Sequence, residues 1–197
     1  MAGDAANRST GRLESTNVVR DDAVALVAAA QRDRLAFAPL YERYAERLFR
    51  YVCARTGSAS IAEDIVADAM LTAMNRLAQF DPDRGSFASW LFTIATNEIV
   101  DQRRRSIRHR QTIERAHQPP PPADDALTTL LRNQAARRIH EAPNRLPDND
   151  RDLVLLRYWA ELTSTEIGRV VGISPGNVRV RLKRILGKLA QILEVDQ

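Results

Sequence analysis

The side chains with the most specific chemistry lie near the end of the printed sequence. Thr163 and Glu166 have the spacing of a capping box, which starts a helix. Gly172 suits the left-handed backbone that ends a helix, and Ser174 followed by Pro175 favours the start of another. A short helix, a glycine turn and a second capped helix are the parts of a helix-turn-helix, whose second helix reads duplex DNA.

The expected second helix is basic on one face and apolar on the other. Between Asn177 and Lys188 there are five basic residues and no acidic one. Arginine can pair with guanine, and a small apolar residue can contact a thymine methyl. Such a run taken alone also fits an ordinary solvated face, but the capped helix before it favours DNA. The candidate contacts are Asn177, Arg179, Val180, Arg181, Lys183 and Arg184.

A second group of candidate nucleic-acid contacts lies in a helix expected from Phe87 to about Arg105. It begins with aromatic residues, including Trp90 and Phe92, and it ends in a run, 103–110, with five arginines and no acid. Aromatic rings can stack on unpaired bases while arginines bind phosphates. Core packing is an alternative for the aromatic residues, and a solvated helix end is an alternative for the arginines.

The helix expected over 61–78 carries an unusual stripe. Its buried face would comprise Ile65, Val66, Ala69, Ala73 and Leu77. On the opposite side the residues at helical spacing are Asp64, Asp68, Leu71 and Asn75. An aliphatic residue within a polar stripe suggests a surface that contacts another protein. Single exposed leucines are common, however, so the stripe alone does not decide the matter.

The periodicity is helical throughout, with no convincing alternating strand, and predicts two small helical domains. Pro119 to Pro122 predict a stiff, extended linker between them. We expect residues 1–34 to be disordered or partly helical. The predicted ranges are 35–106 for the first domain, 107–123 for the linker and 124–197 for the second domain.

Composition narrows the function classes. The net charge is +4, so the basic character is local rather than global. Cys53 is the single cysteine of the chain, which excludes an internal disulfide and fits a reducing compartment. The three histidines lack metal-ligand spacing with it, so we expect no metal and no cofactor. We find no secretory signal and no run that could span a bilayer, and we expect a cytoplasmic protein without membrane insertion.

Together these segments resemble the extracytoplasmic-function (ECF) group of bacterial RNA polymerase sigma factors, which contains only sigma regions two and four. The strings that carry the resemblance are Phe37–Tyr44, Ala62–Asp68, Phe80–Asn97 with Asp101 and Arg103–Arg105, and Leu146–Arg184. The resemblance covers about residues 35–106 and 125–193. It implies a protein that binds core RNA polymerase, recognises promoter DNA, promotes its melting and is not itself an enzyme.

The resemblance also implies roles for particular positions. The region-two helix with Asp64, Asp68, Leu71 and Asn75 would dock on the polymerase, and the region-four helix would read the minus-thirty-five element. The residues implied at the minus-ten element and the melted strand are Phe80, Asp81, Arg84, Ser86, Asn97, Asp101, Arg103, Arg104 and Arg105. An anti-sigma factor is a common partner in the group, although nothing in this sequence identifies one.

The chain departs from the family pattern in a few places, and two other function classes fit part of the sequence. Met70 and Met74 stand where members often have an aromatic residue. A stand-alone helix-turn-helix regulator would explain the second domain, but it would leave the acidic stripe and the arginine-rich helix unexplained. A hydrolase using Asp64 and Asp68 would lack the further catalytic side chains that such chemistry needs.

Overall fold

The computed structural model describes residues 23–114 and 142–195. In chain order its helical elements are a helix over 23–32, η1 (Arg34–Phe37), α2 (Ala38–Thr56), α3 (Ala59–Asn75), η2 (Leu77–Gln79), α4 (Phe87–Glu114), η3 (Ala142–Arg145), α7 (Asp148–Tyr158), α8 (Ser164–Val171) and α9 (Pro175–Val195). The described ranges contain no strand, and the predicted all-α class is confirmed. The proline run 119–122 and a helix expected around 127–139 lie outside the described residues.

The first bundle is formed by α2, α3 and α4. α2 begins at Ala38, later than the predicted helix over 35–55, with Pro39 in its first turn, where a missing N–H costs nothing. It ends at Gly57, whose φ of 74° is the left-handed conformation that a residue with a side chain rarely adopts. Ser58 then caps α3 by accepting a hydrogen bond from the Ile61 N–H.

α3 ends earlier than the predicted helix over 61–78. The regular helix stops at Asn75, and the 3-10 turn η2 follows. This bend brings both Leu77 and Phe80 into the core, where they are 3% and 7% exposed. The predicted buried face of the helix is confirmed and also includes Ala62 and Met70, a thioether that adapts to irregular packing.

The segment before α2 is tied to the bundle. Val27 and Ala30 of the helix over 23–32 are buried in the core. The Gln31 amide donates hydrogen bonds to the backbone carbonyls of Leu77, at 2.9 Å, and Phe80, at 3.3 Å. This helix therefore braces the start of the loop between η2 and α4.

The second bundle is formed by α7, α8 and α9 and contains the predicted helix-turn-helix. The capping box of Thr163 and Glu166 is present in both directions, and Gly172 ends α8 with a φ of 73°. The Ser174 hydroxyl accepts from the Asn177 N–H at 3.3 Å and caps α9. The local pattern therefore predicted this turn correctly.

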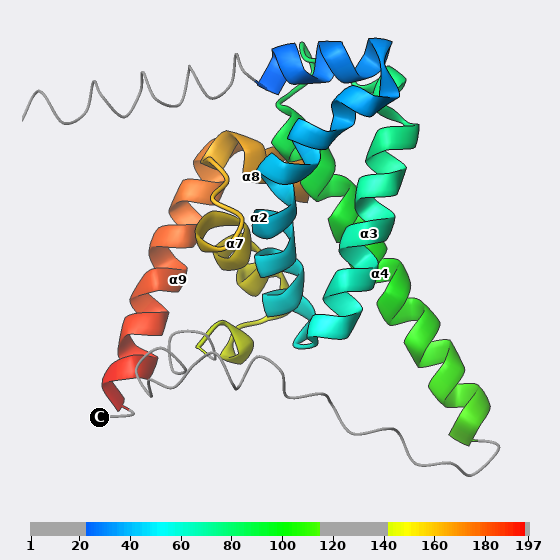
Figure 1. Ribbon diagram of the computed structural model, residues 1–197. Helices are drawn as coiled ribbons and strands as arrows, with labels where there is room; N and C mark the ends of the chain where they lie inside the picture. Colours follow the sequence, from blue (N-terminus) through cyan, green and yellow to red (C-terminus); the bar gives the residue numbers. More distant parts are fainter. Residues whose placement is uncertain (1–22, 115–141, 196–197) are drawn as a thin grey trace, which may run out of the picture.

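The two bundles pack directly against each other. In Figure 1, α2 and α4 stand beside the α7–α8–α9 group, and the C-terminal half of α4 extends away from it. Buried residues of both bundles form one connected apolar cluster, from Val27 on the first side to Leu189 on the second. The two bundles are thus in direct contact and share one apolar core.

Substitution of Gly168 would test how closely the turn between α8 and α9 is packed. A Cβ added there would lie 2.6 Å from the Ile173 backbone oxygen. We expect Gly168→Ala to destabilise the second bundle by about 1–3 kcal/mol, as overpacking does. Gly187 has no heavy atom within 4 Å of an added Cβ, so Gly187→Ala should instead stabilise α9 by about 0.5–1 kcal/mol. Urea unfolding of both variants measures the difference, and equal stabilities would contradict the close approach.

Candidate nucleic-acid interface

The predicted duplex-reading face of α9 is open to solvent. Asn177, Arg179, Lys183 and Arg184 are exposed. Val180 lies among them with 69% of its surface exposed, although it is apolar. The opposite residues of the helix are buried in the second bundle, namely Val178, Leu182, Ile185 and Leu189. A helix fixed by one apolar face presents the other face rigidly, as a groove-reading helix requires.

Arg181 differs from the other candidates on α9. Its guanidinium lies 2.8 Å from the Asp150 carboxylate, and the two side chains are 32% and 10% exposed. Asp150 is in the first turn of α7, so the pair fastens α9 to α7. We interpret Arg181 as a residue that positions the reading helix, with at most part of its guanidinium available to DNA.

The loop between η2 and α4 contains both buried and exposed candidates. Phe80 is buried, and its ring centroid lies 5.7 Å from that of Phe87 and 5.5 Å from that of Trp90. Asp81 and Arg84 are exposed, and the Asp81 carboxylate accepts a hydrogen bond from the Asp83 N–H at 2.9 Å. The aromatic cluster therefore anchors a tight polar turn that faces solvent.

The aromatic residues at the start of α4 pack in or against the hydrophobic core. Phe87 is 2% exposed and Phe92 is fully buried, while Trp90 is half-buried against Phe80 and Phe87. The alternative of core packing, rather than base stacking, is therefore confirmed for both phenylalanines.

The later part of α4 holds exposed polar and basic residues. Asn97, Asp101 and the three arginines of 103–105 are all exposed. Arg104 lies 3.5 Å from Asp101, and Arg105 lies 3.7 Å from Glu98. Such exposed pairs are weak, so phosphates could take over these guanidinium groups at little cost.

The stripe on α3 lies on the solvent side, as predicted. Asp64, Asp68 and Asn75 are exposed, and Leu71 has 51% of its surface exposed. The Asn75 amide oxygen accepts a 2.6 Å hydrogen bond from Arg34. The stripe thus combines two exposed carboxylates with one half-exposed apolar side chain, Leu71, beside them.

Ser86 joins the loop to the helix-turn-helix. Its hydroxyl accepts from the Ser89 N–H at 3.2 Å, as a helix cap, and donates to the Glu166 carboxylate at 2.7 Å. Glu166 is also the acidic member of the capping box of α8. This contact joins residues 80 positions apart, and no sequence pattern could have predicted it.

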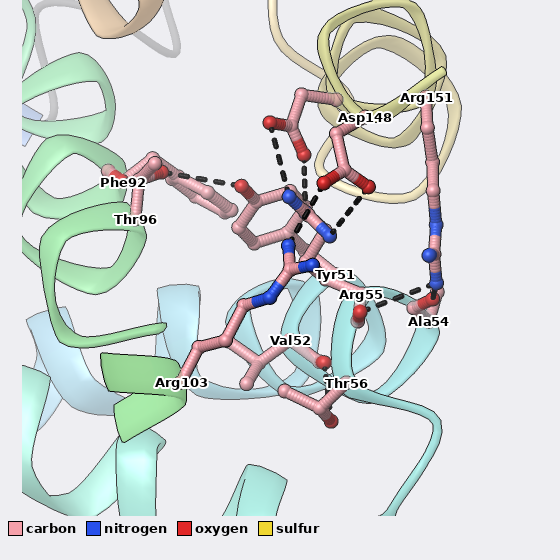
Figure 2. A network of polar contacts seen from close by, with 11 residues as sticks. Tyr51, Val52, Ala54, Arg55, Thr56, Phe92, Thr96, Arg103, Asp148 and Arg151 are labelled. Carbon is pink, nitrogen blue, oxygen red and sulfur yellow. Dashed lines mark hydrogen bonds and ion pairs between the residues drawn. The ribbon is translucent and has the colours of Figure 1, made fainter. Parts of the chain in front are cut away.

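A cluster of charges joins the bundles at the other end of the contact (Figure 2). Arg55, Arg103, Asp148 and Arg151 are labelled there. Arg55 of α2 forms an ion pair with Asp152 of α7, and their side chains are 13% and 17% exposed. Asp148 lies 2.8 Å from Arg103 and 3.7 Å from Arg55. Arg151 donates to the carbonyl oxygens of Ala54 and Arg55, at 2.9 and 3.2 Å. Sequence analysis missed this cluster, because its partners come from three separate helices.

The ionisation of the two carboxyl groups differs with their surroundings. Burial raises the pKa of Asp152, and the nearby Arg55 only partly offsets that effect. The hydrogen bond from Arg103 and the charge of Arg55 lower the pKa of Asp148. Asp148 therefore stays an anion, and Asp152 depends on its arginine partner to remain one.

The residues that the structure describes contain neither a metal site nor a membrane-spanning helix. No group of three or more His, Cys, Asp or Glu side chains there could hold a metal ion. None of the helices in the described ranges is long and apolar enough to cross a membrane. Cys53 is buried, and burial raises the pKa of its thiol, as expected for a core residue.

Comparisons with known proteins agree with this arrangement. The family model of sigma-70 region 2 matches residues 40–109, and that of sigma-70 region 4 matches residues 136–189. The chain is 32% identical over 174 residues to the ECF RNA polymerase sigma factor RpoE of Cereibacter sphaeroides, covering 87% of this chain and 95% of the relative.

Solved structures share the fold. The structure of CnrH in complex with the cytosolic domain of CnrY matches with a TM-score of 0.67 and 24% identity, covering 89% of this chain and 99% of CnrH. The sigma factor RpoE from Bartonella quintana, solved in complex with the anti-sigma factor NepR, matches with a TM-score of 0.64 and 21% identity, covering 82% and 98%.

Two helical bundles with an exposed basic recognition helix define a DNA-binding protein of the sigma-70 type. The chain belongs to the ECF group of RNA polymerase sigma factors. It acts in transcription initiation together with core RNA polymerase and promoter DNA, as the resemblance in the sequence indicated.

The free energy of unfolding can distinguish Arg181, which pairs with Asp150, from Arg184, which is exposed on α9. Arg181→Met would leave the Asp150 carboxylate nearly buried without its partner, so we expect a loss of about 2–4 kcal/mol. Arg184→Met lies on the exposed face and should change stability by less than about 0.5 kcal/mol. Urea denaturation checks both values. Recovery of stability in Arg181→Met with Asp150→Leu would support the pair, and equal losses in the two single variants would contradict it.

Proposed function

We propose that the exposed face of α9 reads the minus-thirty-five promoter element. The observation that carries this proposal is the exposure of a valine among basic residues, on a helix whose other face is buried. Val180 can contact thymine methyl groups, while Arg179 and Arg184 can pair with guanine or phosphate. Asn177 and Lys183 extend the same face, and the start of α9 favours a phosphate oxygen. Arg181 holds the helix in place.

The minus-ten element is assigned to the loop after η2 and to α4. Asp81, Arg84 and Ser86 line the turn that would receive a base from the melted strand, and Phe80 anchors that turn from beneath. Asn97, Asp101 and Arg103–Arg105 follow along the exposed part of α4, where they would contact the edge of the melted strand and the upstream duplex.

The stripe on α3 is assigned to core polymerase. Asp64 and Asp68 supply negative charge, Leu71 supplies an apolar contact, and Asn75 supplies a polar end. Exposed apolar surface within charged residues is typical of a contact with another protein. The sigma factor would carry out no reaction itself and would supply promoter specificity to the polymerase in the cytoplasm.

An anti-sigma factor is a further proposed partner. It is supported by the fold shared with the Bartonella quintana sigma factor, which was solved with the anti-sigma factor NepR.

Arg184→Ala tests the assignment of α9. Loss of a base contact should weaken use of the promoter by about 1–3 kcal/mol, or roughly 5- to 150-fold, without weakening polymerase binding. The measurement is in vitro transcription on a promoter mapped with the wild-type chain, alongside core binding by fluorescence anisotropy. Arg32→Ala is the control, because Arg32 bonds to Ala28 of its own helix. Equal losses for promoter use and core binding would count against the assignment.

Asp64→Arg combined with Leu71→Ala tests the docking surface. Charge reversal and removal of the apolar contact should weaken binding to core polymerase by at least tenfold. Binding to a minus-thirty-five duplex in the absence of polymerase should stay unchanged. Glu42→Arg of α2 with Val24→Ala of the helix over 23–32 makes the same types of change at exposed positions outside the stripe and should have little effect. Wild-type affinity of the first double variant for core would refute the docking claim.

A further inference from the structure

A short helix outside the proposed DNA surfaces holds the start of the loop between η2 and α4. The helix over 23–32 is fixed to the first bundle by Val27 and Ala30, which are buried in the core. Gln31 lies at the end of this helix, and its side-chain amide reaches the backbone of η2. The helix precedes residues 40–109, which match the region-two model, so that match gives it no role.

Gln31 contacts the backbone on both sides of the bend that leads into the loop. Its Nε2 donates to the Leu77 carbonyl oxygen at 2.9 Å and to the Phe80 carbonyl oxygen at 3.3 Å. The Phe80 N–H donates to the same Leu77 oxygen at 3.1 Å. One amide group therefore ties the turn of η2 to the last carbonyl group before Asp81.

The Phe80 carbonyl belongs to the peptide group that begins the exposed turn. Because this peptide is trans and planar, holding the Phe80 C=O also fixes the Asp81 N–H, which points the opposite way. The turn that follows is closed by local bonds. The Asp81 carboxylate accepts from the Asp83 N–H at 2.9 Å, and the Asp81 carbonyl accepts from the Arg84 N–H at 3.2 Å. The first peptide group therefore sets the direction of the whole turn.

The aromatic contacts of Phe80 do not fix that peptide group by themselves. The Phe80 ring centroid lies 5.7 Å from that of Phe87 and 5.5 Å from that of Trp90, which fixes the side chain. The carbonyl group can still rotate about the backbone bond next to it, since φ and ψ are the soft dihedrals of the chain. A hydrogen bond restricts this rotation because it weakens steeply when it is bent.

This brace belongs to the region-two bundle alone. At the far end of the loop, Ser86 bonds to Glu166 of the second bundle. At the near end, Gln31, Leu77 and Phe80 all lie in the first bundle. The orientation of the start of the loop is therefore set within the bundle that carries the loop.

We propose that Gln31 is a positioning residue for recognition of the minus-ten element, and that the helix over 23–32 is part of the unit that reads it. Gln31 holds the Phe80–Asp81 peptide and so keeps the exposed turn in the orientation in which Asp81 and Arg84 face a captured base. It acts through the loop and does not itself contact DNA. This inference rests on the role proposed for the loop.

Loss of the brace should reduce the choice among bases. A turn that samples several orientations spends less time in the one that fits the correct base, and it can contact a wrong base in the others. A neutral hydrogen bond is worth a factor of roughly two to ten in such an equilibrium. A merely structural role would lower the folded fraction of the protein, and that fraction cancels in a ratio of two promoters measured with one preparation.

Gln31→Met is the test variant, because it keeps the length of the side chain and removes both donated bonds. Holoenzyme reconstituted from core polymerase and each chain would transcribe promoters that differ by one base of the minus-ten element from the promoter mapped with the wild-type chain. We expect the preference for the best base over the others to fall roughly two- to tenfold at a position read by the loop. Base preference at the minus-thirty-five element and affinity for core should stay at wild-type values.

Gln31→Glu is the second variant. It keeps the shape of the side chain but turns a carboxylate toward two carbonyl oxygens, so it should lose at least as much preference as Gln31→Met. Arg32→Met is the matched control, since Arg32 lies on the same helix and bonds to Ala28 within it. The control should keep the wild-type preferences, and circular dichroism would verify that every variant is folded.

The outcomes separate this inference from the proposed function. Wild-type minus-ten preferences in both Gln31 variants would overturn the inference and leave the proposed function intact. A loss of the same size in Arg32→Met, or an equal loss of preference at the minus-thirty-five element, would also overturn it. A wild-type chain without base preference at any minus-ten position would overturn the role proposed for the loop instead.

Discussion

The arrangement of the two halves depends on the charges between α2 and α7. Arg55 and Asp152 are mostly buried where the bundles meet, and Arg103 and Asp148 extend the cluster toward solvent. A buried carboxylate without a cation is strongly unfavourable, so each partner fixes where the other can lie. Together with the apolar cluster that the two bundles share, the pairing favours one docking of the second bundle on the first. The position of the helix-turn-helix relative to the loop after η2 follows from that docking.

In this docking, the two surfaces proposed to bind DNA differ in their contacts with the rest of the protein. The face of α9 proposed to read duplex DNA is exposed, because the apolar side of the helix is buried in its own bundle. In the loop after η2, Asp81 and Arg84 are exposed, whereas Ser86 at its end is bonded to Glu166 of α8.

The sequence predicted the parts of the fold that are set by neighbours along the chain. The capping box of Thr163 and Glu166 and the turn at Gly172 were correct, because three or four residues determine each of them. The α3 stripe lay on the solvent side as expected, because helical spacing sorts apolar from polar residues.

Contacts between distant segments could not be predicted in this way. Ser86 and Glu166 meet only because the bundles dock, and Arg181 turned toward Asp150 of α7 rather than toward solvent. The phenylalanines of α4 were ambiguous for the same reason, since a ring can pack in a core or stack on a base. Only the position of the neighbouring helices decides between these roles.

Mapping of transcript starts tests the account most directly. Core RNA polymerase and the purified chain would be incubated with fragmented genomic DNA of the organism that encodes it, and new transcript ends would be located. The account predicts discrete starts preceded by two shared sequence elements, one near minus ten and one near minus thirty-five. Starts that share a single element, or no starts while the chain is bound to active core, would contradict the assignment of two reading surfaces.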